Sequence, residues 1–312
     1  MNTAMAVGSF VVGLVVGLTG MGGGALMTPM LVLFFGVQPL AAVSSDLVAS
    51  VFMKPFGGLV HLRRRTVDLR LVKWLCVGSV PSAFAGALLI KLFGHGEQVQ
   101  HGVQIALGVA LLIAAAGIAA KAYTSLRESR SGRPRETSQP IVVRPLPTVA
   151  VGVVGGLVVG LTSVGSGSLI IVALLALYPT LRAGRLVGTD LVQAVPLVIA
   201  AALGHVLFGD FQFAVTASVL VGAIPGVLLG ALGSSRLPGG VIRRVLVVVL
   251  VASALKMLGA GNVALLVAVP AVALAVTLGW MAIRRGHGLP ALPRRARPRT
   301  PGERDPATSA SG

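Results

Sequence analysis

Acidic residues are rare in this sequence, and charged residues of either sign are few. Asp and Glu together number 9 among 312 residues, and the four charged residue types make up only 11%. Hydrophobic residues make up 55%, and the mean hydropathy is +0.91. A soluble domain of this length exposes far more charge. Apolar runs of about 17–25 residues, enough to span a hydrocarbon core, recur along the chain. We therefore expect an all-α polytopic membrane protein.

Cysteine is nearly absent, and so are the sequence motifs of enzymes. The single Cys76 cannot form an intrachain disulfide or a metal cluster. The chain has no H-E-x-x-H pair and no P-loop. The GSGS run at 165–168 lacks the strand–turn–helix setting of a serine-hydrolase elbow. We expect no catalytic residues, no metal and no cofactor.

The net charge of +17 has the sign of a nucleic-acid-binding protein, but its distribution does not. Basic residues gather in the loop at 62–73, in the stretch 121–147 and in the tail at 284–312. Short basic loops beside apolar segments follow the positive-inside rule. The expected partner is therefore the lipid bilayer and not nucleic acid. The first ten residues, MNTAMAVGSF, lack the basic start of a signal peptide and are predicted to begin the first membrane segment.

The apolar runs divide the chain into two similar halves. Predicted membrane segments occupy 4–36, 40–61, 70–93, 100–120, 148–178, 185–207, 211–233, 241–258 and 262–283. The expected organisation is a first transmembrane repeat at 1–120, a cytoplasmic linker at 121–147, a second repeat at 148–258, an extra helix at 259–283 and a disordered basic cytoplasmic tail at 284–312.

An internal duplication relates the two halves. At an offset of 143, Gly13, Gly17, Thr19, Gly22 and Gly24 match Gly156, Gly160, Thr162, Gly165 and Gly167. At an offset of 144, Asp46, His61, Gly78, Pro81 and Gly86 match Asp190, His205, Gly222, Pro225 and Gly230. Glycine matches are common by chance in membrane helices, but Asp, His and Pro matching at one offset are not. We therefore predict a repeat.

Loop charge predicts that the two repeats are inverted. The basic loop at 62–73 places the end of segment 40–61 in the cytoplasm. Arg182 and Arg185 instead place the start of its counterpart, 185–207, on that side. The two counterparts therefore run in opposite directions. Counting segments gives about seven full spans, an N-terminus outside and a C-terminus in the cytoplasm.

Each repeat opens with a segment that glycine interrupts. TGMGGG at 19–24 breaks segment 4–36, and TSVGSG at 162–167 breaks segment 148–178. Each arm is shorter than the roughly 20 residues that a straight crossing needs. A re-entrant hairpin with glycine at its tip fits this length, while two short full crossings give the same topology and stay open.

The glycine tips are the candidate substrate site. Glycine leaves backbone N–H groups accessible, and the helix that begins after each break presents its N-terminus to an anion. The alternative is that the glycines only allow close packing of helices. A glycine break that recurs at matched positions in inverted halves instead favours a role in a substrate pathway. The candidate binding residues are Thr19, Gly20, Gly22, Gly23, Gly24, Thr162, Ser163, Gly165, Ser166, Gly167 and Ser168.

Four polar residues inside apolar segments are candidates for gating or coupling. Asp46 and Asp190 sit near the starts of counterpart helices, so each is either a helix cap or dipole partner or a coupling or gating carboxylate. Lys54 lies deep in its segment and is either a counter-charge to an anionic substrate, the role that we favour, or the partner of a carboxylate. Gln193 lies one turn after Thr189 and is a candidate to line the same cavity. His61 and His205, near helix ends, are expected at the membrane interfaces.

These motifs resemble a known family. GLTGMGGGALMTPML, with SSDLVAS and the basic loop HLRRRTVDL, resembles the first half of the TauE/SafE family of sulfite and organosulfonate exporters, also called the 4-toluene sulfonate uptake permease family. GLTSVGSGSLIIVALL and VGTDLVQAVPLVIAAALGH resemble its second half, and together they cover about residues 4–258. The second motif has Ser166 and Ser168 where more glycine is expected.

The resemblance implies export of small sulfur-containing anions across a prokaryotic plasma (inner) membrane. Combined with the residue pattern, it predicts a secondary transporter that binds its anion between the glycine tips with alternating access. A proton or sodium ion is the candidate coupling ion. The rivals are a cation-coupled carrier of another solute through Asp46 and Asp190, and a membrane assembly protein without transport.

Overall fold

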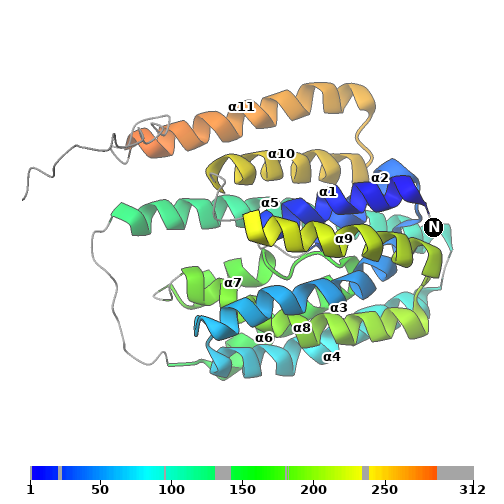
Figure 1. The fold of residues 1–312 in the computed structure, drawn as a ribbon, viewed down its shortest axis with the longest axis horizontal. Coiled ribbons are helices and arrows are strands. Elements are labelled where there is room, and N and C mark those ends of the chain that lie inside the picture. The colour runs from blue at the N-terminus through cyan, green and yellow to red at the C-terminus, as the bar shows by residue number, and fades with distance from the viewer. Residues whose placement is uncertain are drawn as a thin grey trace, which may run out of the picture.

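The protein is a bundle of long helices in the computed structural model (Figure 1), which describes residues 2–19, 23–94, 96–130, 142–179, 181, 183–233 and 239–286. Within these ranges it has eleven helices and no β-strand. The helices are α1 Thr3–Thr19, α2 Gly24–Phe35, α3 Pro39–Arg63, α4 Leu69–Phe93, α5 Glu97–Arg130, α6 Pro145–Thr162, α7 Leu169–Leu177, α8 Ala183–Phe208, α9 Phe213–Gly233, α10 Gly239–Met257 and α11 Asn262–Gly286.

Local chemistry explains several of the helix boundaries. Pro39 and Pro145 occupy the first turns of α3 and α6, where the missing N–H costs nothing. Asp68 caps α4, because its Oδ1 accepts hydrogen bonds from the backbone N–H groups of Arg70 at 3.1 Å and Leu71 at 3.3 Å. Gly36 closes α2 with a φ of 62°, the left-handed geometry that favours glycine.

Six of the described helices are both long and apolar enough to cross a membrane: α4, α5, α6, α8, α9 and α11. The sequence-based count of about seven spans included α3 and α10 and left out α6. Both α3, with 25 residues, and α10, with 19, are long enough to cross, but polar and charged side chains lower their hydropathy. The 18 residues of α6 make it longer than the short arm that we expected.

Two boundaries differ from the prediction. Helix α5 continues to Arg130, so residues 121–130 are helical and the expected linker is shorter at its start. Helix α11 continues to Gly286, three residues into the expected tail. The remainder of the linker, 131–141, and of the tail, 287–312, lies outside the described residues.

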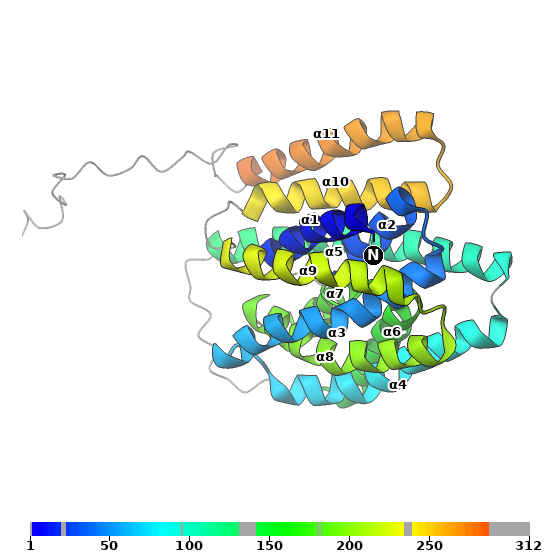
Figure 2. The ribbon, with the colours of Figure 1, turned by 45° about the vertical axis from the view of Figure 1, so that its right-hand side comes forward.

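The closest helix pairs combine one helix from each half of the chain. Helix α1 packs along α9, and α4 packs along α6. Helices α3 and α8 pack against each other between these pairs, and α5 packs against α10. Figure 2 shows α11 on the outer side of α10, and the apolar stretch of α11 is not buried.

Glycine brings these pairs into backbone contact. A Cβ atom on Gly13 of α1 would lie 3.0 Å from Cα of Ala223 on α9. A Cβ atom on the matched Gly156 of α6 would lie 2.7 Å from Cα of Ser79 on α4. Ser79 and Ala223 are themselves counterparts at the offset of 144. The same holds for Gly17 with Val227 and Gly160 with Ala83, and for Gly78 with Val149 and Gly222 with Ala6. The contacts therefore repeat at the offsets found in the sequence.

Counterpart helices α3 and α8 run antiparallel. Ser44, near the start of α3, contacts His205, near the end of α8. Gly58, near the end of α3, faces Leu191, near the start of α8. Opposite directions in two counterpart helices are the geometry that inverted halves require.

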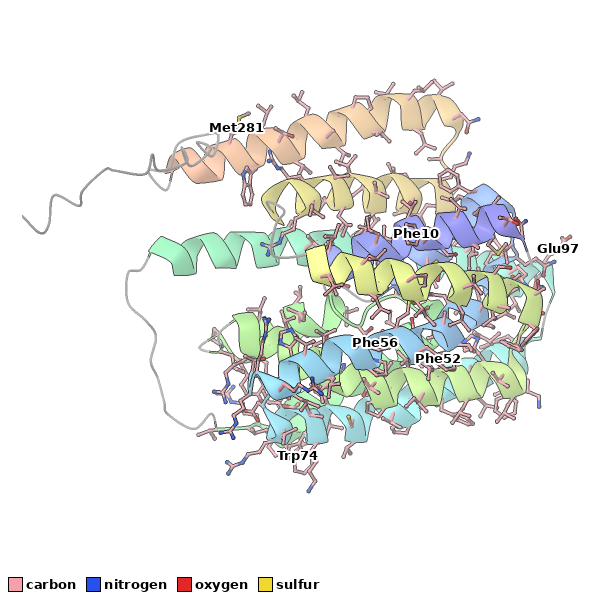
Figure 3. The ribbon with its side chains drawn as sticks, viewed as in Figure 1. Phe10, Phe52, Phe56, Trp74, Glu97 and Met281 are labelled. Carbon is pink, nitrogen blue, oxygen red and sulfur yellow. The ribbon has the colours of Figure 1, made fainter. Side chains whose placement is uncertain are left out.

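Charge separates the two ends of the bundle. In Figure 3 nitrogen-bearing side chains gather at the end marked by Trp74, where α3 ends and α4 begins, whereas Glu97 lies at the opposite end. This loop carries Arg63, Arg64 and Arg65. A concentration of basic residues at one end of the helices is what the positive-inside rule leads us to expect of a membrane protein.

Candidate functional site

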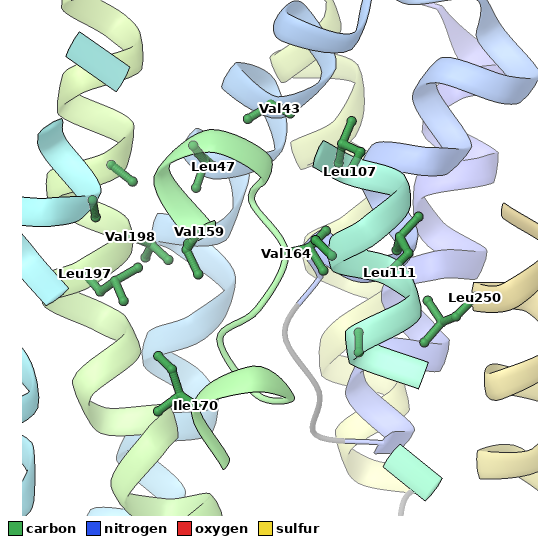
Figure 4. Close-up of a cluster of buried hydrophobic side chains, with 14 of the residues drawn as sticks. Val43, Leu47, Leu107, Leu111, Val159, Val164, Ile170, Leu197, Val198 and Leu250 are labelled. Atoms are coloured by element: carbon green, nitrogen blue, oxygen red, sulfur yellow. The ribbon is translucent and has the colours of Figure 1, made fainter. Parts of the chain in front are cut away.

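Both glycine steps interrupt a helix where the sequence indicates. Helix α1 ends at Thr19 and α2 begins at Gly24, while Gly20 and Gly22 lie outside the described residues. In the second step, Gly165 and Gly167 have φ values of 128° and 99°, which glycine adopts without strain. Figure 4 shows the non-helical chain between Val159 and Ile170, with Val164 among apolar side chains near α5. We call residues 19–24 the first tip and residues 162–168 the second tip.

The second tip lies within the depth of the bundle. Gly160, at the end of α6, packs against Gly86 of α4. Beyond Gly86, α4 continues to Phe93, whereas α6 stops at Thr162, so the tip ends roughly 8 Å short of the end of α4 at 1.5 Å per residue. Ser163, Val164 and Gly165 are buried. Non-helical backbone at such a depth is tolerated where protein surrounds it.

The two tips meet. A Cβ atom on Gly24 would lie 2.7 Å from the carbonyl carbon of Ser163 and 2.9 Å from its Oγ. No side chain fits at this contact, because the backbone of one tip rests directly on the other. Segments more than a hundred residues apart in the chain therefore form one structural unit, which the sequence indicated only through its repeat.

A carboxylate bridges the tips. Asp46 of α3 accepts hydrogen bonds at Oδ2 from Thr28 Oγ1 of α2, at 2.8 Å, and from Ser163 Oγ of the second tip, at 2.7 Å. All three side chains are buried. The Ser163 hydroxyl, which we expected to donate to an anionic substrate, donates to Asp46 instead. Thr28 was not among the candidates, although its place one turn after Gly24 puts it on the helix that starts at the tip.

A buried ammonium approaches the second tip. Lys54 of α3 is only 6% exposed, and its Nζ donates a hydrogen bond to Ser166 Oγ at 2.6 Å. The charge interacts electrostatically with Asp190 and, less strongly, with Asp46. A charge inside an apolar bundle requires such partners. The prediction that Lys54 lies within the helix bundle and not in a loop is therefore correct.

Asp190 and Gln193 connect α8 to α4. Gln193 donates from Nε2 to Asp190 Oδ1 at 3.1 Å and accepts at Oε1 from Ser79 Oγ of α4, also at 3.1 Å. Asp190 and Asp46 both lie beyond the first turn of their helices, because α8 begins at Ala183 and α3 at Pro39. The interpretation of either carboxylate as a helix cap is therefore wrong.

Two predicted hydroxyl donors are engaged within their own helices. Thr19 Oγ1 donates to the carbonyl of Val15 at 2.8 Å, and Thr162 Oγ1 donates to that of Val158 at 2.6 Å. Neither hydroxyl therefore contacts a charged group in the other tip. The hydroxyls of the second tip that contact charged groups are those of Ser163, which faces Asp46, and Ser166, which faces Lys54.

His205, predicted at a membrane interface, is covered by neighbouring helices near the end of α8. It is fully buried on α8, with Nε2 donating to the Gly160 carbonyl at 2.7 Å and Nδ1 2.8 Å from Ser44 Oγ of α3. The imidazole therefore connects α8, α6 and α3 beside the second tip. Its contacts with Ser44 of α3 and Gly160 of α6 show that both helices cover this side chain. Hydropathy alone does not report this cover.

Transition-metal chemistry has no support at this site. Within the residues that the structure describes, no group of three or more His, Cys, Asp or Glu side chains could hold a metal ion. The site instead combines two carboxylates, one ammonium and several hydroxyls around two contacting tips. Such a set can bind small ions of either sign.

Comparison with known proteins gives consistent results. The model of the family described as "Sulfite exporter TauE/SafE" matches residues 5–257. The chain is 36% identical over 259 residues to the "Probable membrane transporter protein YjnA" of Bacillus subtilis (strain 168), covering 83% of this chain and 100% of that protein. It is 22% identical over 236 residues to the "Probable membrane transporter protein YdhB" of the same organism, covering 75% and 91%. No solved structure matches.

Proposed function

The chain belongs to the TauE/SafE sulfite exporter family of membrane transporters, and on that premise we propose that it is a secondary transporter of small sulfur-containing anions such as sulfite or organosulfonates. Export is the direction that the family description supports. The proposed location is a prokaryotic plasma (inner) membrane, with the N-terminus outside and the basic end of the bundle in the cytoplasm.

The Lys54 ammonium at the second tip is the observation that carries this proposal. A buried positive charge held by Ser166 Oγ at 2.6 Å offers an anion a charge-assisted hydrogen bond at the depth where both helices break. Helix α7 begins at Leu169, just after this tip, and its N-terminus adds a favourable field. In this proposal the anion approaches Lys54 beside Ser166 and the start of α7.

The proposed alternating access moves units that combine both halves of the chain. Because α1 packs on α9 and α4 on α6 through glycine contacts, the two repeats cannot rock against each other as separate bodies. The moving units are instead these mixed pairs. Pro81 in α4 and Pro225 in α9 lie inside their helices, where proline permits a local bend.

Flux measurements in proteoliposomes test the substrate class. We expect counterflow with at least one of sulfite, sulfate, thiosulfate or an organosulfonate, measured with and without a pH gradient. Lys54→Met should lower the flux about tenfold or more, a loss of about 1.4 kcal/mol. Lys91→Met is the matched control, because Lys91 is exposed and lies over the Phe208 ring. Absence of counterflow for every sulfur oxyanion would refute the substrate class, and normal flux in Lys54→Met would refute the role of the lysine.

A further inference from the structure

The residues around the Lys54 ammonium have counterparts at the first tip. Ser166 corresponds to Gly23 at the offset of 143, and Asp190 corresponds to Asp46 at the offset of 144. The Lys54 ammonium hydrogen-bonds Ser166 and interacts electrostatically with Asp190, and both of these residues belong to the second half. The counterpart of Lys54 itself is Val198, which carries no charge. The second tip therefore has a lysine ammonium beside it, whereas the matched position for the first tip has no positively charged side chain.

Two buried oxygen atoms face the corresponding position at the first tip. A Cβ atom on Gly23 would lie 3.7 Å from Asp46 Oδ1 and 4.0 Å from Ser50 Oγ. Ser50 follows Asp46 by one helical turn, so both side chains lie on the same face of α3. Asp46 Oδ2 already accepts two hydrogen bonds, but Oδ1 and Ser50 Oγ have no hydrogen-bond partner among the described residues. Buried polar atoms in this state are rare, and two of them facing the same glycine, one of them a carboxylate oxygen, point to a ligand at this position.

A small monovalent cation fits this pair of atoms. Carboxylate and hydroxyl oxygens are hard ligands that suit alkali and alkaline-earth ions and not soft metals. A single nearby carboxylate balances one positive charge, as Asp190 does for the tethered ammonium. Helix α1 also ends at Thr19, beside the first tip, and the C-terminal end of a helix attracts cations.

We infer that a sodium ion binds at the first tip between Asp46 Oδ1, Ser50 Oγ and Gly23, as the exchangeable counterpart of the Lys54 ammonium at the second tip. The ion neutralises Asp46, whose charge would otherwise repel an anion that approaches the contacting tips. Its coupling to anion movement rests on the proposed function, whereas its binding does not. Sodium is then released or taken up with each transported anion.

Thermal unfolding of the purified full-length protein tests the binding without any sulfur anion. We expect the apparent Tm in NaCl to exceed that in KCl of equal ionic strength by about 4 °C at saturation. Ser50→Ala and Gly23→Ala should each abolish most of this difference. The φ of −58° at Gly23 accepts alanine, and the new methyl group would occupy the site after a small movement of the Met53 end, now 3.1 Å away.

Ser9→Ala is the matched control, because Ser9 Oγ is equally buried and has no partner within the described part of the chain, but lies on α1 well before the tip. It should keep the full sodium-dependent difference. A wild-type protein with equal Tm in the two salts overturns the inference. A difference that persists in both site variants overturns the site. A Tm that depends on pH and not on sodium assigns a proton to Asp46 and overturns the identity of the ion.

The flux assay separates this inference from the proposed function. A sodium-dependent Tm without counterflow of any sulfur oxyanion refutes the substrate class and leaves the cation site standing. Counterflow that is equal in sodium and potassium, combined with equal Tm values, refutes the cation site and leaves the anion transporter standing.

Discussion

The two halves of the molecule share a framework but not a site. Glycines at matched positions pack against matched residues in the α1–α9 and α4–α6 pairs, so the backbone of each half meets the other in the same way. The polar residues differ. Thr28 and Lys54 correspond to Ile171 and Val198 in the second half. The two halves therefore have similar helix packing, but Thr28 and Lys54 give the first half polar side chains where the second half has apolar ones.

The free-energy costs of close helix packing and of a buried ammonium explain why the first is found in both halves and the second in only one. Close helix packing in a membrane depends on small residues along the whole contact, so a change in either half breaks the fold. Burying a charged side chain away from water costs free energy. The single Lys54 ammonium offsets part of this cost for the two buried carboxylates, Asp46 and Asp190. A second lysine at Val198 would add another desolvation penalty. The close packing and the buried carboxylate therefore occur in both halves, whereas the buried ammonium occurs in one.

The largest effect is expected from breaking the shared framework. Gly13→Leu and Gly156→Leu place a side chain against the backbone of the partner helix, and each should destabilise the protein by about 3 kcal/mol or more. Gly279→Leu is the control, since nothing lies within 4 Å of that position on α11. Size-exclusion chromatography and thermal unfolding in detergent measure the outcome. If only one of the matched pair is harmful, the two interfaces are not equivalent.

Substitution of the two carboxylates by alanine should have an intermediate effect on stability, and hydrogen–deuterium exchange should distinguish the two variants. Asp46→Ala leaves the Thr28 and Ser163 hydroxyls buried without their acceptor, at a cost of about 2–3 kcal/mol. It should also raise hydrogen–deuterium exchange across residues 163–168. Asp190→Ala should raise exchange in this segment less than Asp46→Ala does, because the printed hydrogen bond of Asp190 goes to Gln193 on its own helix and it acts on the second tip only through the charge of Lys54. Equal exchange in both variants would show that Asp46 does not join the tips.

A smaller effect should separate the two matched histidines. His205→Ala removes the donor to the Gly160 carbonyl and should cost about 1–3 kcal/mol. His205→Gln, which restores a donor, should recover part of this loss. His61→Ala should cost about 1 kcal/mol or less, because His61 is half-buried beside Thr66 at the helix end. Thermal unfolding compares the three variants, and a larger loss at His61 would contradict the burial argument.

Much of the fold follows from the sequence, because hydropathy and glycine report directly on membrane helices. The apolar runs locate the helices, and TGMGGG and TSVGSG locate the breaks at Thr19 and Thr162. The basic loop after α3 indicates the opposite courses of α3 and α8, since charge marks the cytoplasmic side.

The site is harder to predict from the sequence than the fold, because hydropathy does not indicate which helix faces pack together. Thr28 and Ser163 converge on Asp46 only after α2, α3 and the second tip have packed. His205 is buried because α3 and α6 cover it. Helix α5 continues to Arg130 because polar residues can prolong a helix beyond its apolar part.

The pairing of α1 with α9 sets an order of events during synthesis. Helix α1 leaves the ribosome well before its partner at 213–233, which emerges about two hundred residues later. The glycine face of α1 must therefore wait in the bilayer, covered by lipid or by an insertion factor, until α9 arrives. Contacts so distant in the chain slow folding. The first half therefore lacks its packing partner until most of the second half has been made.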